Sequence, residues 1–176
     1  MGLLLSLAMA AATAAAPGCA ADGLGTSRTL TLKREAAAWG SAQHAPLTGL
    51  APGEIVLTFD DGPRPESTPL VLKALADQCV QASFFMNGEP LRQHAALARQ
   101  VRDAGHTVGM HGDRHEHFSQ LPPAAQTADL DAMVATYRAA LGAEPAAWRF
   151  PFLEETPTLR AALKARGLTV MSVDAG

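Results

Sequence analysis

The strongest constraint on the fold is an alternation, repeated from residue 54 onward, between short apolar runs and longer segments with helical periodicity. Five short runs rich in apolar and β-branched residues predict buried strands: residues 55–59, 82–86, 106–110, 147–150 and 168–173. Four longer segments with an apolar face predict helices: residues 68–78, 90–104, 122–141 and 156–166. Strand followed by helix, repeated, predicts an α/β fold with a parallel sheet, in which binding sites form at the carboxyl ends of the strands.

The N-terminal part of the chain lacks this alternation and divides into two segments. Residues 1–21 are apolar and Ala-rich, and the run 3–10 has the length of a signal-peptide core, although no Lys or Arg precedes it. We expect an export signal and no membrane span in the mature chain; an Ala-rich leader is the alternative. Cys19 follows a faintly lipoprotein-like sequence, so a lipid anchor is a further alternative. Residues 22–53 predict a linker or a loose N-terminal extension, followed by one domain over residues 54–176.

Composition narrows the classes of function. Of the 176 residues, 48% are apolar, which is enough for a packed core, and the net charge is -3. Because the sequence contains no cluster of Lys and Arg, we expect no nucleic-acid partner. Two cysteines are too few for a disulfide-framed miniprotein or for a four-cysteine zinc site.

Two adjacent carboxylates, Asp60 and Asp61, follow the first predicted strand. Side chains of neighbouring strand residues point to opposite faces, but a turn at the strand end can bring both into one pocket. There they would be placed for different roles in acid–base or metal chemistry. The alternative is a plain Asp-Gly turn with two solvated acids.

Histidine and arginine follow two other predicted strands. His111 and His115 are four residues apart, so on a helical turn both rings would lie on one side. Two such histidines and one carboxylate are a usual ligand set for catalytic zinc, and a solvated histidine pair is the alternative. Arg149 stands among apolar residues at the end of the fourth strand. If buried it needs an acidic partner, whereas at the rim it would reach solvent.

Together these motifs resemble the polysaccharide deacetylase family, the NodB-homology domain of carbohydrate esterase family 4. The run Thr-Phe-Asp-Asp-Gly-Pro at 58–63 is similar to the family's first motif. The segment from Gly105 to His111, with His115 after it, resembles the second, and Arg-Phe-Pro-Phe at 149–152 resembles the third. The resemblance covers roughly residues 55–174, in order and with family-like spacing.

This resemblance implies a fold and a metal site. The fold would be a distorted (β/α) barrel, here incomplete, with about five parallel strands and covering helices. The metal would be a divalent ion, usually zinc, bound by Asp61, His111 and His115. The implied substrate is an acetylated polysaccharide that carries N-acetyl or O-acetyl groups.

The resemblance also implies how the acetyl group would be removed. Asp60 takes the position of the general base, and Arg149 takes that of the residue paired with it. Phe152 replaces a tyrosine whose backbone N–H is offered to the oxyanion, and a phenylalanine keeps that N–H. The expected activity is therefore metal-dependent hydrolysis.

The sequence departs from the family pattern at three places. Gly112 stands where the family has Ser or Thr, which removes a hydroxyl near the metal site. Residues 172–174 begin like the fourth motif without completing it, and the fifth, with the histidine that acts as acid, would lie beyond Gly176. We therefore expect a C-terminally truncated copy. The alternatives to an active deacetylase are a catalytically incompetent remnant that binds metal or glycan, and a hydrolase of small cyclic amides on the same scaffold.

Overall fold

The structure is a computed structural model that describes residues 23–32 and 35–175. The predicted export signal over 1–21 and the possible lipid anchor at Cys19 lie outside the described residues. Among the helices of the described ranges, none has both the length and the apolar character needed to cross a bilayer.

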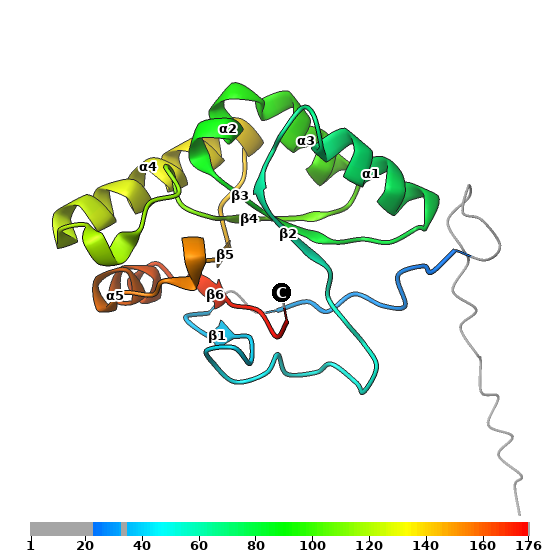
Figure 1. The fold of residues 1–176 in the computed structure, drawn as a ribbon, viewed down its shortest axis with the longest axis horizontal. Helices are drawn as coiled ribbons and strands as arrows, with labels where there is room; N and C mark the ends of the chain where they lie inside the picture. Colours follow the sequence, from blue (N-terminus) through cyan, green and yellow to red (C-terminus); the bar gives the residue numbers. More distant parts are fainter. Residues whose placement is uncertain (1–22, 33–34, 176) are drawn as a thin grey trace, which may run out of the picture.

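In the described part of the chain, six strands form one parallel sheet and helices cover it (Figure 1). The strands are β1 (Ala38–Trp39), β2 (Thr58–Gly62), β3 (Ser83–Met86), β4 (Thr107–Met110), β5 (Ala147–Trp148) and β6 (Thr169–Met171). The α-helices are α1 (Thr68–Asp77), α2 (Gly88–Gln93), α3 (Ala95–Asp103), α4 (Pro123–Leu141) and α5 (Pro157–Ala165), and the 3-10 helices are η1 (Phe118–Gln120) and η2 (Pro151–Leu153). The strand order β1-β6-β5-β4-β3-β2 leaves β1 and β2 at the two edges. The predicted α/β class is confirmed, and the sheet is open, as in an incomplete barrel.

The edge strand β1 lies inside the segment 22–53, for which the sequence predicts a linker or a loose extension. Its pairing with β6 is parallel, and the Val170 N–H donates to the Ala37 carbonyl over 2.9 Å. For residues 38–39 the expectation is corrected, and the sheet has six strands where the sequence predicts five. A strand of two residues is too short to produce an alternating pattern, so only its pairing partner reveals it.

The second edge strand, β2, begins later than the apolar run predicts. The run covers 55–59, but the strand covers Thr58–Gly62, and Ile55 is 85% exposed. Because β2 is an edge strand, it has β3 on one side and no other strand of the described chain on its other side. An apolar run thus marks the strand without fixing its ends.

The predicted helix over 90–104 is two helices. It is interrupted between α2 and α3 at His94, whose φ of -127° and ψ of 39° lie outside the helical region. Periodicity is insensitive to a break at a single residue, because the apolar positions on both sides keep their spacing.

The core lies between the strands and helices α1 to α5. The longest helix, α4, fixes its position on the sheet through Tyr137, whose buried hydroxyl donates to the Val108 carbonyl of β4 over 3.0 Å. The largest fully buried side chains include Trp148, Phe118, Phe150, Met86, Leu91, Met110, Leu130 and Met133. They hold β3, β4 and β5 rigidly, and the polar residues that follow these strands lie at their carboxyl ends.

Candidate metal and catalytic site

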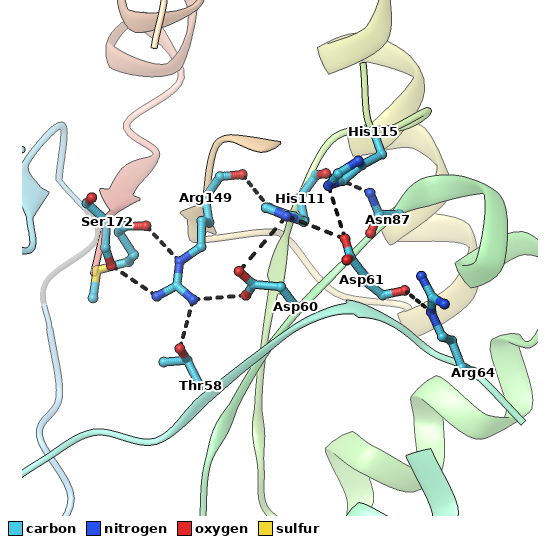
Figure 2. A network of polar contacts seen from close by, with 10 residues as sticks. Thr58, Asp60, Asp61, Arg64, Asn87, His111, His115, Arg149 and Ser172 are labelled. Atoms are coloured by element: carbon cyan, nitrogen blue, oxygen red, sulfur yellow. Dashed lines mark hydrogen bonds and ion pairs between the residues drawn. The ribbon is translucent and has the colours of Figure 1, made fainter. Parts of the chain in front are cut away.

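An irregularity in β2 brings both adjacent carboxylates to one side of the sheet. The register with β3 shifts between Asp60 and Gly62, and Asp61 has a φ of 68°. In a regular strand the two side chains would point to opposite faces. Here both approach His111, with its Nε2 4.0 Å from Asp60 Oδ2 and 3.6 Å from Asp61 Oδ1 (Figure 2).

Asp61, His111 and His115 converge on one point although Asp61 belongs to β2 and the two histidines to the loop after β4. One ligand atom from each lies within 4.8 Å of the other two. The His115 Nε2 atom is 3.1 Å from Asp61 Oδ1, a buried oxygen with no hydrogen-bond partner among the described residues. Two imidazole nitrogens around an unsatisfied carboxylate oxygen suit a divalent metal ion. The three residues therefore fit the metal site that their sequence motifs predict.

His111 is oriented by its own ring. Its Nδ1 atom lies 2.9 Å from the Arg149 carbonyl oxygen, which can only accept, so Nδ1 carries the proton and Nε2 is free for a metal. The side chain is 3% exposed, and burial lowers the pKa of His111, while the nearby Asp60 carboxylate acts in the opposite direction. The neutral ring is the form that binds metals.

Arg149 forms the opposite wall of the site and is 3% exposed. Its guanidinium donates to Asp60 Oδ1 over 2.9 Å and to Thr58 Oγ1 over 2.7 Å, and it also donates to the Met171 and Ser172 carbonyls. The sequence allowed Arg149 to be either buried with an acidic partner or exposed at the rim. It is buried, and Asp60 is its acidic partner. Figure 2 shows Asp60 held toward Arg149 while Asp61 turns toward His115.

A glycine makes room for this arginine. The Arg149 guanidinium carbon lies 4.2 Å from the centroid of the Phe85 ring. That ring occupies the space beside Gly109, where an added Cβ would come within 2.6 Å of it. The small residue in β4 therefore lets Phe85 lie flat enough to support the cation, a favourable cation–π arrangement.

The loop between the two histidines is held by acids that the sequence interpretation missed. Asp129 of α4 accepts the backbone N–H groups of Asp113 and Arg114, over 2.8 and 3.2 Å. Burial raises the pKa of Asp129, and these two hydrogen bonds oppose that shift. The buried Asp113 carboxylate pairs with Arg92 of α2. These contacts fix the loop that contains Gly112.

The partners of Asp113 and Asp129 explain why they escape a motif search. Asp129 binds backbone groups, which every residue type supplies, and it lies 16 positions from Asp113 in the sequence. One feature of the sequence could have pointed to Asp129. It occupies a buried position of a helix, where an acidic side chain needs a partner.

Phe152 lies beside the histidines, in the middle of η2. Its ring centroid is 4.5 Å from that of His115 and 3.8 Å from that of His117, on which it stacks with an interplanar angle of 10°. The residue has a φ of 55° and remains 51% exposed, so its ring faces the solvent side of the site. All six residues singled out by the sequence therefore gather around one end of the sheet.

An Asp-His-His cluster that could hold a metal ion, with a second aspartate beside it, thus lies at the carboxyl edge of an open parallel α/β sheet. Residues 49–171 match the sequence profile of the family described as Polysaccharide deacetylase. The chain belongs to this family.

Individual relatives agree with this assignment. A peptidoglycan-N-acetylglucosamine deacetylase of Bacillus cereus is 42% identical over 65 residues, which are 37% of this chain and 30% of that protein. A chitooligosaccharide deacetylase of Rhizobium leguminosarum is 44% identical over 61 residues, 35% of this chain and 28% of the relative. A family 4 carbohydrate esterase from Streptomyces lividans, solved with acetate, superposes with a TM-score of 0.64 at 34% identity, covering 69% of this chain and 62% of the other. The matches thus span less than two thirds of each relative.

Proposed function

We propose that this protein is a zinc-dependent deacetylase that hydrolyses acetyl groups from an N-acetylated or O-acetylated glycan. The observation that carries the proposal is that the two adjacent carboxylates have different partners. Asp61 lies against two histidines, and Asp60 lies against one arginine. One aspartate is therefore placed to hold a metal and the other to move a proton.

Asp61, His111 and His115 are assigned as the metal ligands, and two nitrogens with one carboxylate oxygen favour zinc. When bound, the metal would supply a Lewis acid that polarises the acetyl carbonyl. The ligands stay in place because the Arg149 carbonyl orients His111 and Asp129 holds the loop between the histidines.

Asp60 is assigned as the general base, and the buried Arg149 keeps it oriented. Hydrolysis adds water across the bond to the acetyl group: Asp60 takes a proton from the water, the bond between the acetyl carbon and nitrogen or oxygen breaks, and the leaving atom gains a proton. The Phe152 backbone N–H is assigned to the negative charge that develops on the carbonyl oxygen. The Phe152 backbone has a φ of 55°, outside the helical region, within η2.

The relatives support a glycan substrate, because their names specify peptidoglycan N-acetylglucosamine and chito-oligosaccharides. We further infer that the chain is exported, on the strength of its apolar N-terminal sequence. An acetylated polymer of the cell envelope or of the surroundings is the substrate that such a location would offer.

The proposal is tested by acetate release from N-acetylated chito-oligosaccharides and O-acetylated xylo-oligosaccharides. We expect turnover with zinc, its loss after chelation and its return when zinc is restored. Zinc binding without turnover would instead identify a remnant that retains only the metal site. Turnover confined to a panel of small cyclic amides would assign the scaffold to that other reaction.

A further inference from the structure

Asn87 follows β3 and is the only asparagine of the chain, with 4% of its surface exposed. Its Nδ2 atom donates to the His111 carbonyl oxygen over 3.0 Å. Because a carbonyl oxygen only accepts, this contact fixes which end of the amide is which. The Oδ1 atom points the other way, and it is buried without a hydrogen-bond partner among the described residues.

The position of Asn87 makes this orphaned oxygen unusual. Asn87 is the N-cap residue of α2, where an asparagine oxygen normally accepts a backbone N–H of the first helical turn. Its backbone has the φ of -83° and ψ of 149° suited to capping, yet its side chain makes no capping hydrogen bond. The Asn87 Oδ1 atom therefore does not cap α2, although its position at the start of the helix would allow it. Burying an acceptor in this way is unfavourable unless a partner arrives.

Asn87 also borders a cleft of about 360 Å³. Asn87 lines it together with two of the predicted metal ligands, Asp61 and His115, and the cleft continues toward Arg64 and Arg114. Figure 2 shows the Asn87 side chain beside Asp61 and His115, on the side away from Asp60 and Arg149. A molecule that reaches the metal ligands through this cleft would pass the Asn87 amide.

We propose that Asn87 is a specificity-determining residue whose Oδ1 atom accepts a hydrogen bond from the sugar unit that carries the acetyl group. This inference rests on the proposed function. The donor is a sugar O–H or the acetamido N–H, since a neutral amide oxygen pairs well with either. The attacking water is a poorer partner, because the base that must take its proton, Asp60, lies on the far side of Asp61.

The test compares Asn87→Ala with the wild type on two substrates in the zinc-loaded full chain. An N-acetylated chito-oligosaccharide offers both donors, the sugar O–H and the acetamido N–H. The aryl ester 4-nitrophenyl acetate has neither of these groups. We expect kcat/KM on the oligosaccharide to fall about tenfold or more, with little change on the aryl ester. The ester rate of Asp61→Ala is subtracted as background, and the bound zinc per chain should be unchanged in Asn87→Ala.

Two further variants and a third substrate sharpen the result. Gln100→Ala, an exposed amide on α3, should behave as the wild type. Asn87→Asp restores an acceptor but not the donor to the His111 carbonyl, so it should recover part of the oligosaccharide activity lost in Asn87→Ala. An O-acetylated xylo-oligosaccharide separates the two donors: its rate falls if Asn87 binds a hydroxyl and stays constant if Asn87 binds the acetamido N–H.

The outcomes that overturn the inference differ from those that overturn the proposed function. An equal loss on both the chito-oligosaccharide and the aryl ester would mean that Asn87 acts only through His111 or the water, and no loss would mean that it does nothing for the sugar. If the wild type turns over no acetylated glycan, the proposed function fails, and calorimetric binding of the chito-oligosaccharide decides about Asn87. Weaker binding by Asn87→Ala supports the sugar contact; equal or absent binding overturns it.

Discussion

The buried guanidinium of Arg149 lies 2.9 Å from the Asp60 carboxylate, across 89 residues of sequence. The same guanidinium holds the carbonyls of Met171 and Ser172, so it ties β2 to the end of β6 through the interior of the site. With Oδ1 in this pair, Asp60 has its other oxygen 4.0 Å from His111 Nε2, whereas Asp61 Oδ1 lies 3.6 Å from Nε2 of His111 and 3.1 Å from Nε2 of His115. The ion pair therefore distinguishes two aspartates that are adjacent in the chain.

The first prediction tests that separation. Asp61→Ala should lose zinc, and with it all turnover, because a ligand is required for the site to exist. Asp60→Asn should keep one zinc per chain yet lose about 10²–10⁴-fold in kcat, because a base is needed only in the transition state. Zinc content and acetate release are measured side by side. If Asp60→Asn loses zinc while Asp61→Ala keeps it, the two assignments are reversed.

The second prediction concerns Arg149→Lys. A lysine keeps the charge but cannot make the directed contacts of a planar guanidinium, so the Met171 and Ser172 carbonyls lose their donor. We expect a loss of about 2–3 kcal/mol in the free energy of unfolding, as for buried acceptors without partners. Chemical denaturation measures it. An unchanged midpoint would show that water replaces the guanidinium at both carbonyls.

The third prediction concerns the loop between the histidines. Asp129→Ala removes the acceptor of the Asp113 and Arg114 N–H groups, and we expect zinc affinity to fall about 10–100-fold. Asp131→Ala on the same helix is the matched control, since Asp131 is exposed and forms a surface ion pair with the half-exposed Arg166. Competition with a chelator gives both affinities. Equal affinities in the two variants would contradict a positioning role for Asp129.

The residues that converge at the candidate metal site could be predicted from the sequence because they stand next to strand ends. Asp60 and Asp61 follow one apolar run and His111 follows another, and parallel strands bring their carboxyl ends to one edge. What the sequence did not predict is how two adjacent carboxylates reach the same side. That depends on the register shift after Asp60 and on the positive φ of Asp61, a conformation that an aspartate tolerates but does not require.

The supporting residues were invisible for a different reason. Asp129 and Asn87 act on backbone groups of the histidine loop, and a backbone group carries no side-chain identity to search for. Similarly, β1 is identified by its pairing with β6 rather than by any pattern of its own. The sequence thus predicts side chains that carry chemistry, while the contacts that hold them emerge only from the packed structure.

The last prediction is a pH dependence of stability that arises away from the site, at His106. Its Nδ1 atom accepts the buried Ala82 N–H over 3.2 Å, and its ring lies 5.3 Å from that of Phe84. Burial lowers the pKa of His106 below its ordinary value of 6.5, so the folded state favours the neutral ring. Below about pH 6.5 the unfolded chain then binds more protons than the folded chain, and stability must fall as the pH falls.

The variant that isolates this effect is His106→Asn, whose Oδ1 atom can accept the Ala82 N–H in place of Nδ1 but does not titrate. We expect the melting temperature of the wild type to drop more steeply between pH 7.5 and 5 than that of the variant. Both proteins are measured without zinc, so that protonation of the other histidines contributes equally and cancels in the difference. Parallel curves would show that His106 takes up a proton as readily in the folded chain as in the unfolded one.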